Sequence, residues 1–462
     1  MHPVAHPRPL GWQAECSQTL RLAGPLALAN VLQMMTYAVD VIFIARLGTA
    51  QLAASSLMIA IFGTVVWSLQ GLGGAVAPLI AAELGARAPA LRAVRRSVRM
   101  ALWLAAASGT LAMLLFTQAG TLLRLTGQDP AIIVLAEPFM HLLLWAVVPM
   151  VMASVLRNFV SALGRPLFAT AITALAIGVN AGGNYILVFG NFGAPAMGLE
   201  GSAVSTVVSA LFVVGAYVLA IRFNRRLARY HVFGKFWRPD WARLGQLLRI
   251  GVPIALTILA EAGVFGAAAF LMGRIGADAL AAHTLALHIA SFAFQVPQGV
   301  AQATAIRVGY YFGAREPLGV TRAGWAGIAM GMAFMVVTAG LMLLAPQYLL
   351  ALYVDAWDPA NAPLVALAST YLVVGAAFQL FDGTQVAVAG ALRGLQDASV
   401  PMWIALFSYW IPGFGLAAWL GLMTPLAGVG VWIGLAVGLV FVACLLLHRW
   451  HRRELLGLVT QP

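Results

Sequence analysis

Three of the fifteen acidic residues lie inside long apolar segments of this 462-residue sequence. Asp40 occurs in TYAVDVIFIARLG, Glu261 in ILAEAGVF and Asp382 in GAAFQLFDGTQVAVAGALRG. A charged side chain in the centre of a bilayer costs about 2.5–3.5 kcal/mol even on insertion scales, so acids in such positions usually mark a route for ions or protons. Their chemistry would be reversible binding of H⁺ or of a metal cation such as Na⁺. This interpretation requires that the surrounding segments cross a membrane.

The composition predicts an all-α polytopic membrane protein. Hydrophobic residues make up 62% of the chain and charged residues 9%, with a mean hydropathy of +0.91, whereas soluble domains carry about 25% charged residues. Apolar runs long enough to cross a hydrocarbon core recur along the whole chain, and alternating strand patterns do not. We predict twelve spans, near residues 19–46, 53–83, 98–119, 131–158, 167–190, 198–222, 247–273, 279–312, 320–344, 363–393, 400–421 and 427–448.

The distribution of Arg and Lys predicts the orientation of these spans. With both termini in the cytoplasm, only Arg46, Arg124 and Arg274 fall in segments expected outside, as the positive-inside rule requires. The net charge of +12 is then explained by topology and by contact with anionic lipid, so no nucleic-acid partner is expected. Cys16 and Cys444 make neither a disulfide framework nor a metal site.

An internal repeat predicts two similar halves. Residues 21–87 match residues 249–315 without a gap, so that RLGTAQLAA meets RIGADALAA and Gly85-Ala86-Arg87 meets Gly313-Ala314-Arg315. Six helices are therefore duplicated in the same orientation, which predicts two pseudo-symmetric six-helix bundles related by an axis along the membrane normal. We expect an N-lobe at 1–222, a cytoplasmic interfacial linker at 223–246 and a C-lobe at 247–462.

The two halves differ at their ionisable positions. Gln33 aligns with Glu261, and Asp40 aligns with Ala268. Each lobe therefore has one acid on its first helix, at a different depth, and we expect the lobes to do different jobs.

Glu261 and Asp382 belong to the same lobe and to similar depths. Glu261 lies about 18 Å along its helix from Arg249, and Asp382 about 16 Å from Arg393. Two neighbouring carboxylates in a medium of low dielectric constant cannot both stay ionised without a cation, so this pair could hold a proton or bind Na⁺. The alternative is that both acids only brace helices through hydrogen bonds.

The N-lobe carries a second polar group of residues. Asn180 and Asn184 are four residues apart and share one helix face, as do Tyr37 and Asp40 at a spacing of three. Side-chain carbonyls on such a face could coordinate a cation or hold a carboxyl group. Asn pairs can also simply join neighbouring helices, and both interpretations stay open.

The sequence resembles the multidrug and toxic compound extrusion (MATE) transporters, in their bacterial NorM-like branch, over nearly its whole length. The resemblance depends on GPLALANVLQMMTYAVDVIFIARLG, ELGAR, VNAGGNYILVFGNFG, VPIALTILAEAGVFGAAAFLMGRIGADALAAHT, AIRVGYYFGAR and FQLFDGTQVAVAGALRGLQD. It implies a pair of six-helix bundles in the bacterial cytoplasmic membrane, acting as a monomer that exports mostly cationic organic compounds in exchange for H⁺ or Na⁺. No cofactor beyond the coupling ion is implied.

The resemblance also implies roles for individual residues. Glu261 and Asp382 would form the cation site of the C-lobe, and Asp40 with Asn180 and Asn184 the polar cluster of the N-lobe, supported by Tyr37 and Gln33. Some relatives place a tyrosine beside the ion, four residues before the equivalent of Asp382, where this chain has Phe378. Because a ligand for Na⁺ is missing there, H⁺ is favoured.

Two other functions were considered. A flippase for lipid-linked precursors would be expected to line its cavity with several cationic residues for phosphate, but nearly all Arg residues here lie at the predicted cytoplasmic edge. A membrane-embedded enzyme such as an acyltransferase would need paired catalytic groups, and no His here is followed by an acid four or five residues later. His283 and His288 are five residues apart, on different faces of a helix, so a shared metal site is not expected.

Overall fold

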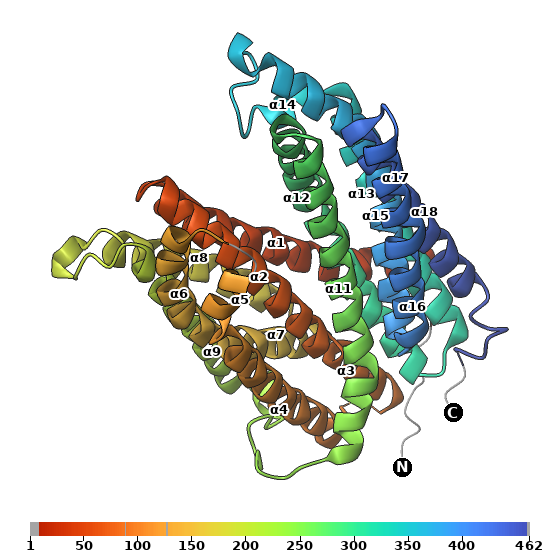
Figure 1. Ribbon diagram of the computed structural model, residues 1–462. Coiled ribbons are helices and arrows are strands. Elements are labelled where there is room, and N and C mark those ends of the chain that lie inside the picture. Colours follow the sequence, from red (N-terminus) through yellow and green to blue (C-terminus); the bar gives the residue numbers. More distant parts are fainter. Residues whose placement is uncertain (1–8, 88, 126–127, 460–462) are drawn as a thin grey trace, which may run out of the picture. The chain divides into compact units, whose positions relative to one another are not determined.

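The computed structural model describes residues 9–87, 89–125 and 128–459, and all the regular elements in these ranges are helical (Figure 1). Twelve helical segments of the described ranges are long and apolar enough to cross a membrane, which confirms the predicted number. The main helices are α1 (Trp12–Ala45), α2 (Thr49–Gly74), α3 (Val76–Ala86), α4 (Leu91–Phe116), α6 (Pro130–Leu143), α7 (Val147–Ala162), α8 (Leu167–Leu187), α9 (Leu199–Phe223), α11 (Trp241–Ile275), α12 (Ala277–Gly313), α13 (Pro317–Leu344), α15 (Ala362–Gly394), α16 (Ser399–Ser408), α17 (Gly415–Met423) and α18 (Ala427–His451); α5 (Ala119–Leu125), α10 (Arg225–Ala228) and α14 (Pro346–Leu350) are short.

The first helix of each half begins earlier than its apolar run. α1 starts at Trp12 and α11 at Trp241, whereas hydropathy placed these starts near 19 and 247. The side chain of Asp240 accepts a hydrogen bond from the backbone N–H of Arg243 at 3.2 Å and so caps the start of α11. Polar capping rather than apolar patterning determines this boundary.

Large apolar side chains point outward from the spanning helices. On α4, Leu111, Leu114 and Leu115 are each more than 60% exposed, and Leu211 and Leu219 on α9 are also exposed. In water such helix faces would have to be covered, but in a bilayer they are solvated by hydrocarbon.

The chain forms two compact units. The first unit contains the start of α1 up to Ala27, the segment Gly85–Arg87 and the chain from Leu256 onward, and the second contains Leu28–Leu84 and Ala88–Ala255. Both α1 and α11 therefore pass from one unit to the other, and they do so at equivalent positions of the repeat. The lobes at 1–222 and 247–462 follow the duplicated sequence instead and stay a prediction.

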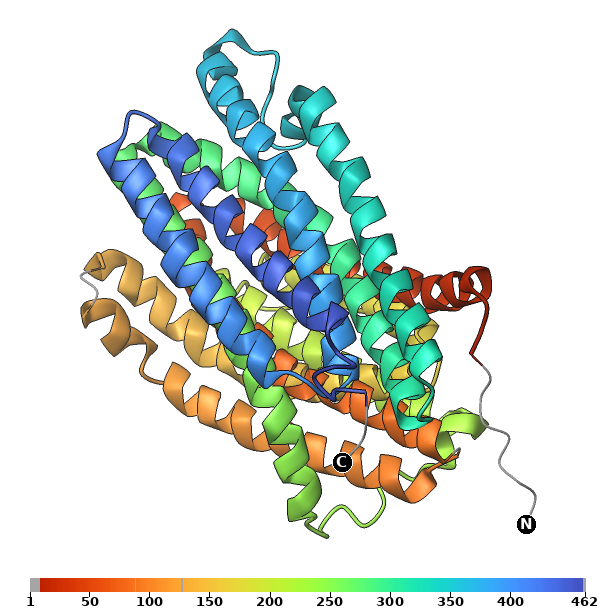
Figure 2. The same ribbon diagram turned by 90° about the vertical axis from the view of Figure 1, so that its right-hand side faces the viewer.

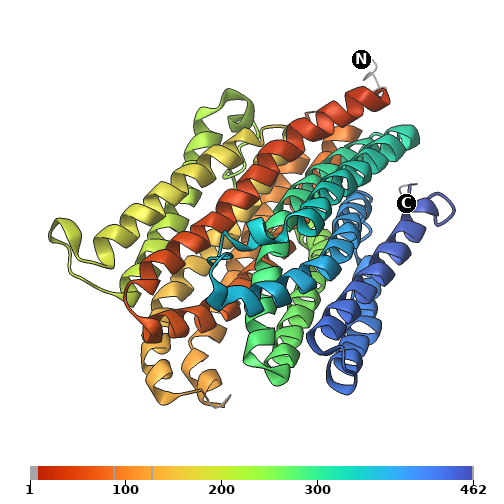
Figure 3. The same cartoon turned by 90° about the horizontal axis from the view of Figure 1, so that it is seen from above.

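In the first unit α12, α13, α15 and α18 pack against one another, and α17 runs beside α18, as the blue segments of Figures 2 and 3 show. The start of α1 belongs to this core, because Ala23 and Leu26 pack on Val300 and Ala303 of α12. Gly299 allows this close approach, since a methyl group there would meet the backbone of Ala27.

A π-helix, Tyr409–Phe414, joins α16 to α17 within one span. Pro412 lies inside it and lacks the N–H that a regular helix would use. Such one-turn widenings occur often at functional sites. Hydropathy predicted an uninterrupted helix at 400–421, because it does not report backbone register.

In the second unit α8 packs against α9, and α7 contacts α2, α4 and α9. Gly183 brings α8 close to α9, because a side chain there would meet Ser205. This close contact positions the polar residues on the same face of α8.

Candidate functional site

Glu261 and Asp382 lie in the same compact unit and near each other. Asp382, on α15, is 5% exposed, and Nε2 of Gln385 donates a hydrogen bond to its Oδ1 at 3.3 Å. Glu261, on α11, is half-buried, and the two carboxyl groups are close enough to interact electrostatically. The structure thus places in one neighbourhood two acids that are far apart in the chain.

Arg393 and Tyr409 belong to the same group. Arg393 of α15 interacts electrostatically with Glu261, and Tyr409 of the π-helix interacts with both acids and with Arg393. The hydroxyl of Tyr409 is buried and finds no hydrogen-bond partner among the described residues. Sequence reasoning placed Arg393 only at the cytoplasmic edge and did not consider Tyr409.

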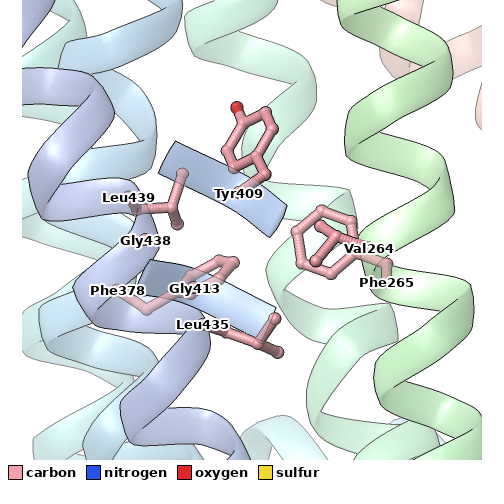
Figure 4. Close-up of a pocket in the computed structure, with 8 residues that line it drawn as sticks. All are labelled: Val264, Phe265, Phe378, Tyr409, Gly413, Leu435, Gly438 and Leu439. Atoms are coloured by element: carbon pink, nitrogen blue, oxygen red, sulfur yellow. The ribbon is translucent and has the colours of Figure 1, made fainter. Parts of the chain in front are cut away.

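A small pocket adjoins this group, with an empty volume of about 210 Å³ (Figure 4). Val264 and Phe265 lie one turn after Glu261, and Phe378 lies one turn before Asp382. The pocket lining is mainly apolar, and in Figure 4 the hydroxyl of Tyr409 points away from the rings of Phe265 and Phe378. The pocket lining therefore provides few side-chain oxygen atoms that could bind a metal ion.

Phe378 occupies the position at which the resemblance suggested an oxygen ligand. Its ring packs edge-on against Phe265 and Trp432, with ring centroids 6.0 and 5.6 Å apart. The ring of Trp432 also packs against that of His283, with ring centroids 5.5 Å apart, whereas His288 packs against Tyr353. The two histidines therefore have separate packing partners.

Asp40, Asn180 and Asn184 come together in the second unit. Asp40 is 6% exposed, and Nδ2 of Asn184 donates to its Oδ1 at 2.8 Å. The hydroxyl of Thr206, on α9, donates to the other carboxyl oxygen at 3.4 Å. Ser205 donates to the backbone carbonyl of Asn180 at 2.8 Å. Thr206 and Ser205 were missed because they come from a helix that the spacing argument did not include.

Tyr37 and Gln33 have different partners. The ring of Tyr37 packs edge-on against Trp67 at 5.9 Å, and its buried hydroxyl has no partner among the described residues. Oε1 of Gln33 accepts a hydrogen bond from Nη1 of Arg157 at 3.1 Å. These two residues share α1 with Asp40, but neither forms a hydrogen bond with its carboxylate among the described residues.

The sequence analysis did not predict three ion pairs at helix ends. Arg307 of α12 holds Glu15 of α1, Arg243 of α11 holds Glu83 of α3, and Arg96 of α4 holds Asp240. The hydrogen bond from Arg96 holds the pKa of Asp240 below its usual value. Each pair joins segments distant in sequence, so local patterns carry no signal for it.

Comparison with known proteins is consistent with this architecture. The family model described as MatE matches residues 25–186 and 253–419, and the two matched stretches start at the equivalent residues Pro25 and Pro253 of the repeat. A probable multidrug resistance protein NorM of Mesorhizobium japonicum is 43% identical over 444 residues, covering 96% of this chain and 95% of that relative. The multidrug resistance protein NorM of Burkholderia vietnamiensis is 36% identical, covering 94% and 93%.

Solved structures agree on the fold. A crystal structure of a eukaryotic MATE transporter superposes with a TM-score of 0.85 at 20% identity, covering 98% of this chain and 97% of that chain. An outward-facing multidrug resistance MATE transporter of the MOP superfamily gives the same score, covering 97% of each. Together with the family model and the NorM relatives, these matches show that the chain belongs to the MatE family of multidrug efflux transporters and is not an enzyme.

Proposed function

We propose that this transporter is an antiporter, which exports mostly cationic organic compounds while a cation enters through Glu261 and Asp382. The observation that carries the proposal is the electrostatic group of Glu261, Asp382, Arg393 and Tyr409 inside spanning helices. Two ionised acids and one guanidinium leave a single net negative charge. One monovalent cation would neutralise this charge, so we propose one coupling ion per cycle.

H⁺ is the favoured coupling ion. Phe378 contributes a ring rather than an oxygen to this region, whereas Na⁺ prefers several oxygen ligands, as hard cations do. A proton needs only one carboxylate oxygen. For an uncharged compound, moving one charge inward at 100 mV contributes about 2.3 kcal/mol, enough for a roughly fifty-fold gradient if coupling is tight. Exchange of one H⁺ for one monovalent cationic compound moves no net charge, so the pH gradient alone drives it.

Asp40 would serve a different role in the other unit. Donors reach both of its carboxyl oxygens, from Asn184 and Thr206, so the carboxylate keeps hydrogen-bond partners when it has lost its proton. The resulting negative charge would attract cationic compounds, and binding of ion and compound would be linked so that each weakens the other.

The chain would lie in the bacterial cytoplasmic membrane with both termini in the cytoplasm. The bacterial source of the NorM relatives and the distribution of Arg support this proposal.

Dye transport in everted membrane vesicles tests the coupling. We expect a pH jump to drive uptake and a Na⁺ jump to have little effect. Glu261→Gln and Asp382→Asn should each abolish pH-driven uptake, because each removes one of the two carboxylates that hold the single coupling proton. Asp278→Asn is the matched control, since Asp278 is an exposed acid of the same unit at the start of α12. Unimpaired coupled uptake in both site variants would reject the assignment, and uptake driven by Na⁺ alone would reject H⁺.

A further inference from the structure

Arg157 of α7 is a cation inside a spanning helix without an ion-pair partner among the described residues. Its Nη1 donates to Oε1 of Gln33 at 3.1 Å, and Tyr217 is an electrostatic neighbour. Its Nε is buried and has no hydrogen-bond partner within the part of the chain that the structure describes. The side chain as a whole is half-buried.

The backbone of Arg157 lies about 8 Å before the end of its span at Ala162, and its guanidinium contacts Gln33 of α1. Gln33 is about 18 Å along α1 from Arg21, which is the same offset that separates Glu261 from Arg249. A positive charge at such depth is costly unless it is paired, and unpaired ones usually serve a function.

The equivalent position in the other unit carries an acid with an arginine nearby. There the residue aligned with Gln33 is Glu261, which interacts with Arg393. The second unit has the neutral amide of Gln33 instead, so the side chain that accepts a hydrogen bond from Arg157 does not neutralise its charge.

The remaining edge of Arg157 is the one that binds carboxylates elsewhere in this chain. Arg307 holds Glu15 through Nε at 2.8 Å and Nη2 at 2.6 Å, a two-point grip that matches carboxylate geometry. In Arg157 the amide of Gln33 takes Nη1, which leaves Nε and Nη2 on the opposite edge.

We propose that Arg157, oriented by Gln33, is a binding site for the carboxylate of exported organic compounds. It is a specificity-determining residue: compounds with a free carboxylate gain a charge-assisted contact that their esters lack. This inference rests on the efflux function and is independent of the coupling ion.

Purified full-length protein in proteoliposomes provides the test, with a carboxyl-rhodamine dye and its methyl ester as probes. The two dyes differ only in the free carboxylate. In Arg157→Gln we expect the KM of the acid to rise about ten-fold to one-hundred-fold while that of the ester stays constant, since the charge-assisted contact with the carboxylate is lost. Arg165→Gln, in the turn after α7, is the control and should leave both values unchanged.

Gln33→Glu tests the same idea without removing the arginine. The new carboxylate should pair with Arg157, neutralise its charge and so raise the KM of the acid selectively. Equal changes in the KM of the acid and of the ester in both variants would overturn the proposal while leaving the export function intact. If the unsubstituted protein transported neither dye, the result would count against export itself.

A phosphate of an anionic lipid has similar chemistry, so the lipid composition separates the two sources. We expect the acid-to-ester ratio to be the same in phosphatidylcholine vesicles with and without phosphatidylglycerol. If phosphatidylglycerol removes the preference for the acid in the unchanged protein, and Arg157→Gln removes this lipid effect, then lipid is the occupant and the proposal fails.

Discussion

The buried ion pair between Glu15 and Arg307 should be among the most sensitive points of the first unit. The carboxylate of Glu15 is 0% exposed, and the side chain of Arg307 is 16% exposed. Glu15 accepts two hydrogen bonds from Arg307 and a third from the hydroxyl of Tyr311 at 2.9 Å. Glu15→Gln keeps the shape but leaves the guanidinium without its counter-charge. Removing one partner of such a pair costs about 3–5 kcal/mol, a large share of a typical unfolding free energy of about 5–15 kcal/mol.

Unfolding in mixed micelles by sodium dodecyl sulfate, followed by tryptophan fluorescence, measures this loss. The double variant Glu15→Leu/Arg307→Met should be more stable than Glu15→Gln alone, because it removes both charges together. Glu137→Gln is the control: its partner Arg124 is 65% exposed, and such a pair contributes only about 0–1 kcal/mol. A loss below about 1 kcal/mol in Glu15→Gln, or a double variant less stable than the single one, would refute this reasoning.

Two further predictions concern packing and pH. Gly299→Ala should destabilise the protein by about 1–3 kcal/mol in the same assay, because the new methyl group meets the backbone of Ala27. The control is Gly266→Ala, whose methyl group meets nothing within 4 Å and which should be neutral or stabilising. Equal effects of the two substitutions on stability would contradict the packing of Gly299 against Ala27. Because Arg96 holds the pKa of Asp240 below its usual value, this interaction stabilises the fold above about pH 4 and is lost as pH falls through that lowered pKa. Thermal unfolding between about pH 5 and pH 3 should show a smaller decline in Asp240→Asn, and an identical decline would contradict the assignment.

The candidate site could be predicted from the sequence only where its members share a helix. Asn180 and Asn184 were identified by their spacing, and Gln385 could have been, since it lies three residues after Asp382. Thr206 and Tyr409 could not, because each comes from another helix. Arg393 was counted as an edge residue, since helical rise gives the depth of a backbone atom but not where a long side chain ends.

Span number, helical class and duplication follow from the sequence alone, because apolar length, charge asymmetry and self-similarity are properties of the chain itself. The tertiary structure alone decided which charged side chains have a partner of opposite charge. Glu15 has Arg307 and Glu261 has Arg393 nearby, whereas the hydrogen-bond partner of Arg157 within the described ranges is the amide of Gln33. It also decided where the backbone widens, at Tyr409–Phe414. The pairing of charges and the site of the π-helix both depend on contacts between residues far apart in the chain. Hydrophobic periodicity carries no information about such contacts.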